Sequence, residues 1–191
     1  MKLISAFLLV FAFYFADAQT QEDSHFEKNG MFFGAAVGVS SINQTSNLLP
    51  AHTDGTISLP NLKIGLMISE YTALAIVLPG SVYRYNGIGR QRTRGLEGII
   101  PSLQYWVKDR WWILSGVGLA IDAPAFYDIK DDTEKKFYFG SAIIAGTGYE
   151  VLRNGRFVLD TQCRVYYGYA NVPEGKKKVS TFCLLIGVNW Y

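Results

Sequence analysis

Few side chains of this sequence are suited to catalysis, and those few lie far apart in the chain. Only two histidines occur, His25 and His52. His52 stands two residues before Asp54, and a carboxylate can orient an imidazole as the general base for a serine or a water. The same stretch, AHTD, is also ordinary in a surface loop. We predict no catalytic residue, and keep His52 with Asp54 as the one pairing that could carry acid–base chemistry.

Residues that bind metals do not form the pattern of a metal site. Strand alternation turns Cys163 outward and Cys183 inward, so we expect neither a shared metal nor a disulfide. The acidic residues of segment 123–135 lack the spacing of a calcium loop. They are Asp128, Asp131, Asp132 and Glu134. The glycines of GIGRQRTRG are followed by no helix that would hold a nucleotide phosphate. We therefore predict no metal and no cofactor.

Four arginines crowd one short segment of the chain. They are Arg84, Arg90, Arg92 and Arg94. Guanidinium groups bind phosphate oxygens through charge-assisted hydrogen bonds. The four arginines could equally pair with the acidic residues of segment 123–135. The formal net charge of the whole chain is only +2. That charge provides no case for a nucleic-acid partner.

The N-terminus indicates export. Lys2 is followed by an apolar run from position 3 to 15, and Ala16-Asp17-Ala18 has the small-x-small pattern of a cleavage site. The apolar run is shorter than the roughly 20 residues that a membrane-spanning helix needs. We predict a signal peptide over residues 1–18, cleaved near Ala18, a short leader over 19–28, and a single domain over 29–191.

The dominant pattern of this domain is an alternation of apolar and small or polar residues, interrupted by turn residues, which is typical of β-strands. Eight such runs are present: 30–42, 57–69, 72–85, 95–107, 110–122, 136–151, 156–170 and 182–191. Long connections of 7 to 14 residues alternate with short ones, of which Asn154-Gly155 is a strong hairpin signal. Long and short connections should therefore lie at opposite ends of one antiparallel meander.

The two faces of these strands differ in a way that indicates which one meets lipid. One face carries Leu, Ile, Val and Phe, whereas the other carries Gly, Ala, Ser and a few charged residues. An eight-stranded barrel has little interior space, so the large apolar side chains fit better outside, as in a transmembrane barrel. We therefore predict an all-β protein, an eight-stranded antiparallel up-and-down transmembrane β-barrel. A secreted soluble barrel, with its apolar face inward, is the competing fold.

The same alternation assigns residues to the lumen and to the membrane interfaces. The predicted polar network of the lumen comprises Lys63, Gln104, Asp122, Glu150, Asp160, Gln162 and Arg164. The aromatic residues predicted at the interfaces are Trp111, Tyr167, Tyr169 and Trp190. Because an unpaired buried charge is costly, we expect Asp160 and Arg164 to meet through Gln162 or through Lys63 and Glu150. The network either fills the lumen or lines a path for protons or small solutes.

From position 30 to 191 the chain resembles the small eight-stranded outer-membrane barrels of Gram-negative bacteria, the OmpA/OmpX/OmpW-like group. The signal peptide, the glycine-rich FFGAAVGVS and the terminal GVNWY carry this resemblance. It implies a place in the cell outer membrane, with both termini in the periplasm and the long loops outside. It also implies that the outer-membrane insertion machinery reads the terminal strand. The C-terminus differs from the usual pattern of this group, in which the last residue is an outward-facing aromatic. Alternation here turns Trp190 outward and the last residue, Tyr191, inward.

The resemblance implies a function only in general terms. Our first expectation is a non-enzymatic structural or surface protein of the outer membrane whose lumen is filled by side chains. The alternative is a narrow channel for small solutes. The third is a lipid A-modifying enzyme, because some barrels of this kind modify lipid A and use a histidine, here His52. The implied partners are outer-membrane lipids and lipopolysaccharide, whose phosphates the four arginines could bind.

Overall fold

The computed structural model describes residues 28–46, 51–86, 91–125, 135–172 and 175–191. Almost all of them belong to antiparallel strands. The strands are β1 (Met31–Thr45), β2 (His52–Ser69), β3 (Thr72–Leu78), β4 (Gly80–Asn86), β5 (Gln91–Lys108), β6 (Trp111–Pro124), β7 (Tyr138–Asn154), β8 (Phe157–Val172) and β9 (Gly175–Trp190). Among the described residues, no helix is long and apolar enough to cross a membrane.

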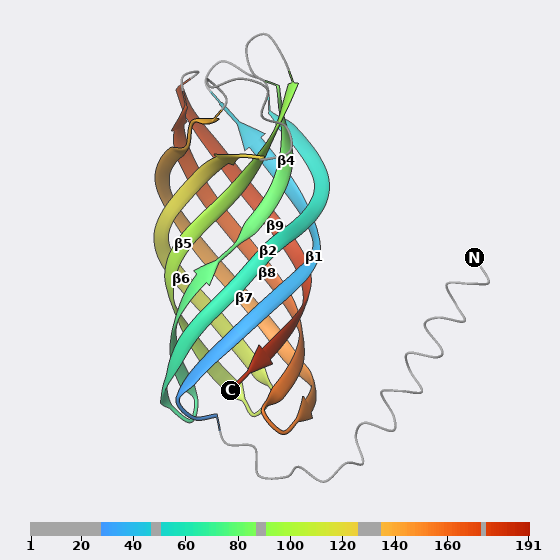
Figure 1. Cartoon of the computed structure of the whole chain (residues 1–191), viewed down its shortest axis with the longest axis vertical. Helices are drawn as coiled ribbons and strands as arrows, with labels where there is room; N and C mark the ends of the chain where they lie inside the picture. The colour runs from blue at the N-terminus through green and yellow to red at the C-terminus, as the bar shows by residue number, and fades with distance from the viewer. Residues whose placement is uncertain (1–27, 47–50, 87–90, 126–134, 173–174) are drawn as a thin grey trace, which may run out of the picture.

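Nine strand segments make eight positions around a closed ring (Figure 1). β3 and β4 run end to end through Pro79, and both pair with β5. Each other strand pairs with the strand before and after it, and β1 closes the ring on β9 from Phe33↔Trp190 to Thr45↔Lys178. Closure matters because hydrocarbon offers no hydrogen bonds to a free strand edge. The predicted eight-stranded antiparallel up-and-down barrel is confirmed.

The connections fall at opposite ends of the barrel. Two-residue turns follow β2, β5 and β7. These turns lie at the end of the barrel where β1 begins and β9 ends. Gly155 in the Asn154-Gly155 turn has a φ of 55°, a left-handed conformation that glycine adopts without steric cost. We call this the short-turn end, and the opposite end the long-loop end.

One stretch of the wall lacks backbone pairing. β2 pairs with β3 as far as Leu62↔Leu78, but beyond that point the described part of β2 has no backbone pairing with β4. Pro60 and Pro79 stand at the beginning of this stretch, and proline has no N–H to give to a ladder. Side chains bridge it instead: Ser58 Oγ donates to the carbonyl of Gly80 at 2.9 Å. We call this stretch the β2–β4 seam, and it lies in the half of the wall toward the long-loop end.

Burial separates the outer wall from the lumen. Large apolar side chains on every side of the ring point outward, and Val117, halfway along β6, is 68% exposed. The residues between them are largely buried, and seven of them are charged. A surface of this composition is what a transmembrane barrel presents to lipid. The period-two prediction of the two faces therefore agrees with the observed burial.

The strands are longer than predicted toward the long-loop end. The last strand begins at Gly175 rather than at 182, and β5 begins at Gln91 rather than at 95. The sequence stretches that they add, GKKKVST and QRTR, are too polar to resemble a lipid-facing strand. They form strands because backbone pairing continues there, as Val172↔Gly175 and Asn86↔Gln91 show.

Candidate functional site

The chemistry of the molecule is concentrated in the lumen, where buried charged groups form three layers. The layer nearest the long-loop end is built on Asp122 of β6, which is fully buried. Its Oδ1 accepts a hydrogen bond from Arg94 Nε, and its Oδ2 pairs with Lys177 Nζ at 2.9 Å. Tyr83 donates its hydroxyl to the same Oδ2 at 2.5 Å. Arg94 also donates to the carbonyl of Lys136 at 2.9 Å. We call this the upper layer.

The layer at the short-turn end is built on Glu150 of β7. Its Oε1 accepts the indole N–H of Trp106 at 2.6 Å and lies 3.3 Å from Lys28 Nζ. Its Oε2 pairs with Arg153 at 2.7 Å. Arg153 also makes two 2.9 Å bonds to the carboxylate of Asp109. We call this the lower layer; it closes the short-turn mouth.

The middle layer lies between these two and is less completely paired. Lys63 Nζ donates to Gln104 Oε1 at 2.9 Å. Asp160 accepts hydrogen bonds from Gln162 Nε2 at 2.6 Å and from Asn189 Nδ2 at 3.0 Å. Arg164 is also buried here, at 3% exposure.

Aromatic side chains pack between the lower and middle layers. The rings of Phe32 and Tyr191 stack with their centroids 5.2 Å apart. Trp106 meets Tyr191 edge-on at 6.2 Å. The Lys63 ammonium lies 5.0 Å from the ring centroid of Trp112, within the range of a cation–π interaction. All these side chains are at most 4% exposed, so this section of the lumen is filled.

A hydroxyl cluster lines the inner side of the β2–β4 seam. Ser58 Oγ and Ser81 Oγ lie 3.1 Å apart, and Ser40 donates to Ser81 at 3.3 Å. Asn61 Nδ2 donates to Ser58 at 3.0 Å, and Ser58 lies 3.6 Å from the sulfur of Cys183. The cluster supplies side-chain hydrogen bonds where the backbone ladder is missing.

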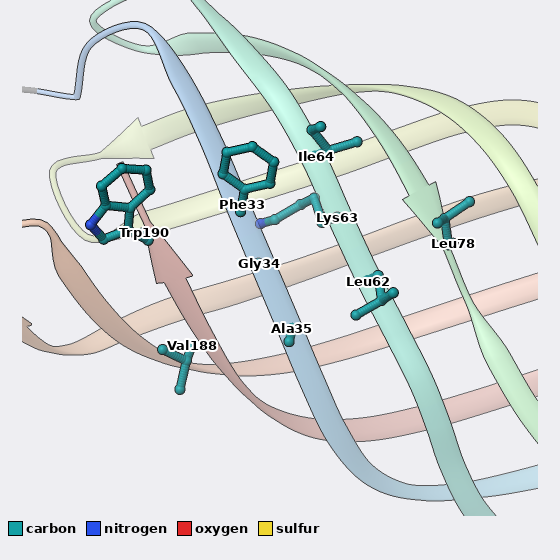
Figure 2. Close-up of a pocket in the computed structure, with 9 residues that line it drawn as sticks. All are labelled: Phe33, Gly34, Ala35, Leu62, Lys63, Ile64, Leu78, Val188 and Trp190. Carbon is teal, nitrogen blue, oxygen red and sulfur yellow. The ribbon is translucent and has the colours of Figure 1, made fainter.

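A hollow of about 490 Å³ lies on the outer wall over β9, β1, β2 and β3 (Figure 2). It is lined by Phe33, Gly34, Ala35, Leu62, Lys63, Ile64, Leu78, Val188 and Trp190. Figure 2 shows Lys63 running from β2 toward Gly34 of β1, where the absence of a side chain leaves room for it. Apart from Lys63 and Gly34 the lining residues belong to the lipid-facing wall, so the hollow fits an acyl chain rather than a polar substrate.

Comparison with known proteins rests on shape alone. No protein-family model and no curated protein matches the sequence. The crystal structure of Ail, the attachment invasion locus protein of Yersinia pestis, covers 85% of this chain and 100% of its own length, with 12% identity and a TM-score of 0.55. Neisserial surface protein A (NspA) covers 85% of this chain and 99% of its own, with 17% identity and a TM-score of 0.55. The chain has the fold of the small eight-stranded outer-membrane β-barrels.

All seven residues that were predicted to form the polar network of the lumen are buried there. They do not form one network. Asp122 belongs to the upper layer and Glu150 to the lower, whereas the other five lie in the middle layer. Gln162 bonds to Asp160 as expected, but Arg164 Nε and Nη1 have no hydrogen-bond partner in the described part of the chain. The predicted bridge between Asp160 and Arg164 is therefore only half formed.

The prediction that Arg94 faces phosphates outside the barrel is wrong. Arg94 lies on the inward face of β5, is 3% exposed and binds Asp122. Alternation continues along β5 beyond the predicted start of the strand, and it turns this guanidinium inward. Arg84 is exposed on β4. Arg92 lies on β5, where only its backbone is described, and Arg90 lies outside the described residues.

The four aromatic residues predicted at the interfaces all point away from the lumen. Trp111, Tyr167 and Trp190 are 41%, 41% and 38% exposed, and Tyr169 is half-buried. Trp111 and Trp190 lie at the short-turn end, and Tyr169 lies toward the long-loop end, where Lys176 Nζ sits 3.8 Å from its ring centroid. Tyr191 turns inward and packs in the lumen, as its place in the alternation predicts.

Of the residues considered for catalysis and metal binding that the structure describes, Cys183 faces the lumen beside Ser58, whereas His52 lies on an exposed part of the wall. His52 Nε2 lies 3.0 Å from Asp54 Oδ1 at the start of β2, with the histidine side chain 52% exposed. Cys163 is half-buried and Cys183 is buried, and both are free thiols. No three His, Cys, Asp or Glu side chains come together as metal ligands in the described ranges. The acidic residues 128, 131, 132 and 134 lie outside those ranges.

Two buried cations of the lumen, Lys28 and Lys177, were not predicted. Lys177 is the second residue of a run of three lysines, and such a run is typical of a solvated loop. The signal that could have found it is the alternation Lys177, Val179, Thr181, which continues the inward face of β9. Lys28 precedes β1, so no strand pattern could place it.

Lys28 makes the lower layer sensitive to pH. Burial lowers the pKa of Lys28 to about 8 from 10.5, against the opposing attraction of Glu150. Between these pH values the unfolded chain holds a proton that the folded chain has released, so the free energy of unfolding rises with pH. We expect the wild type to gain stability relative to Lys28→Met as the pH is raised from 8 to 10.5, in denaturant titrations of the refolded barrel.

The exposed Lys108, the last residue of β5 at the same end, provides the matched control. Lys108→Met should leave the pH dependence of the wild type unchanged. A difference between the wild type and Lys28→Met that is constant over this pH range would contradict the burial of the Lys28 ammonium in the mouth.

Proposed function

We propose that this chain is an integral outer-membrane barrel that acts as a non-enzymatic structural or surface protein and conducts nothing along its axis. The observation that carries this proposal is that three layers of buried charged groups cross the lumen, with packed aromatic side chains between the lower and middle layers. Outer-membrane lipids and lipopolysaccharide surround it, and the insertion machinery reads its closing strand, β9. The apolar outer wall and the likeness in shape to Ail and NspA support this placement.

The filled lumen has a physical consequence. An ion passing along the axis would have to displace Arg153 and Lys28 from Glu150 and then separate Lys177 and Arg94 from Asp122. Breaking one buried pair by removing a partner costs about 3–5 kcal/mol. Two such barriers in series make spontaneous opening rare. A barrel of this kind serves as a rigid support for the segments at its two ends.

Planar bilayers provide the test. We expect the purified barrel to insert without stepwise conductance, while a wide porin added to the same bilayer opens normally. Stepwise conductance would overturn the closed lumen, and a change of its size in Lys63→Met or Arg164→Met would establish the narrow channel in its place. Sodium and chloride are the ions to use, because their hydrated size suits a narrow pore.

The β2–β4 seam favours a second candidate, a lateral path for a small apolar solute between the lumen and the membrane. Side chains alone hold the seam, so local separation there breaks no backbone ladder. A disulfide between Ser58→Cys and Ser81→Cys, made in a Cys183→Ser background, would lock it. The lateral path predicts that vesicles take up an apolar dye, that oxidation of the two cysteines stops this uptake, and that reduction restores it. Uptake that is the same with and without the disulfide would contradict the lateral path.

The lipid A-modifying activity is the third possibility, and it depends on His52. We assign His52 no catalytic role. The His52–Asp54 pair lies on an exposed part of β2, and no serine hydroxyl among the described residues bonds to this pair. An altered lipid A mass in cells that express the wild type, lost in His52→Ala, would reinstate the enzyme.

A further inference from the structure

The three layers of the lumen differ in their balance of charge. The lower layer sets Lys28 and Arg153 against Glu150 and Asp109, so its charges cancel. In the upper layer two cations share the single carboxylate of Asp122. Their remaining donors find other oxygens there: Arg94 binds the carbonyls of Asp122 and Lys136, and Lys177 binds the hydroxyl of Tyr83.

The middle layer has the same surplus of positive charge without this compensation. Lys63 and Arg164 are both buried, at 4% and 3% exposure, and they are close enough to repel each other. Asp160 is the nearby carboxylate, but both of its oxygens accept hydrogen bonds from the neutral amides of Gln162 and Asn189. Within the described ranges, no carboxylate lies within 4.0 Å of either cation.

The middle layer also contains buried donors without acceptors. Arg164 Nε and Nη1 and Trp112 Nε1 have no hydrogen-bond partner among the residues that the structure describes. Trp112 is 0% exposed, so bulk water does not reach its indole nitrogen. A buried N–H without an acceptor is costly, and a buried guanidinium more so.

Two glycines of β7 lie beneath the side chains that carry these donors. Gly146 and Gly148 are two residues apart and face the lumen. A Cβ on Gly146 would lie 2.9 Å from Arg164 Cγ, so the arginine stem crosses this glycine. A Cβ on Gly148 would lie 2.5 Å from Trp112 Cε2, the ring carbon bonded to the unpaired Nε1. The Arg164 and Trp112 side chains therefore lie side by side over β7, with Lys63 on the Trp112 ring.

We propose that the middle layer binds a small monovalent anion of the size of chloride, held by Arg164 and the indole N–H of Trp112. Such an ion accepts several hydrogen bonds at once and cancels the surplus charge of Lys63 and Arg164. A water molecule would occupy the donors but leave the charge uncompensated. Arg164, Trp112 and Lys63 are all buried, so a small anion suits this site better than a large one.

This inference does not depend on the proposed function. The anion site exists whether the barrel is a closed support or a narrow channel, because it follows from the charge balance of one layer. Stepwise conductance in planar bilayers would contradict the closed lumen but not the anion site. A bromide experiment without a bound anion would contradict the anion site but not the closed lumen.

Bromide is the probe, since it replaces chloride and scatters anomalously. Crystals grown in sodium bromide should show an anomalous peak within hydrogen-bond distance of Arg164 and Trp112 Nε1. In solution, the Tm of the wild type should be higher in bromide or chloride than in gluconate at equal ionic strength. This difference should be lost in Arg164→Met and kept in Arg84→Met, which removes an exposed arginine.

The bromide map decides the question even if Arg164→Met does not fold, because it uses the wild type. Ordered water at Arg164 and Trp112 without an anomalous peak would overturn the proposal. So would a Tm difference between bromide and gluconate that persists in a folded Arg164→Met.

Discussion

Asp122→Asn is expected to lower the free energy of unfolding by about 3–5 kcal/mol, because removing one member of a buried ion pair leaves its partners charged and uncompensated. Asparagine keeps the shape of the side chain but not its charge. Arg94 and Lys177, at 3% and 1% exposure, would then face each other across a neutral amide. Denaturant titration of the barrel refolded into lipid vesicles measures the change.

Two further variants show whether charge is the cause. Asp109→Asn removes a carboxylate whose side chain is 70% exposed, and solvent screening should keep its effect to about 0–1 kcal/mol. Adding Lys177→Met to Asp122→Asn removes one of the two uncompensated cations and should restore part of the stability. Equal effects of Asp122→Asn and Asp109→Asn would show that the upper layer is hydrated rather than dry.

Val117→Arg is expected to cost about 2–4 kcal/mol, the value for a cation on the lipid face near the middle of a bilayer. Val117 stands halfway along β6 and is 68% exposed. In a soluble protein an exposed valine could become arginine at little cost. The substitution therefore tests directly whether this wall meets hydrocarbon. The free energy of unfolding in lipid vesicles is the measurement.

Val107 provides the matched position. It also faces outward, at 43% exposure, but it lies next to the turn at the short-turn end. Val107→Arg should cost only about 0–1 kcal/mol, because a cation at the interface reaches the headgroups and water. Equal costs at the two positions would contradict the depth that the barrel assigns to them and thereby the membrane-spanning wall.

The division between wall and lumen could be predicted from the sequence because it is local. Successive side chains of a strand point to opposite sides, so the neighbours of a residue in the chain decide its face. Tyr191 and Cys183 were both predicted to turn inward, and both are buried. The same rule failed at the polar ends of strands, where Arg94 and Lys177 looked like loop residues. Hydrophobicity no longer marks a strand there, although its alternation persists.

The number of strands, their antiparallel order and the two faces of the barrel could be predicted from the sequence alone, through alternation and the lengths of the connections. The tertiary structure decided which buried charges meet. Lys177 and Tyr83 are 94 residues apart, and Lys63 and Gln104 are 41 apart. Their contacts depend on the register between strands and on the tilt of the barrel, which bring side chains from opposite walls to the same height. Spacing along the chain carries no information about that height, so the unpaired donors of Arg164 and Trp112 could be seen only in the folded barrel.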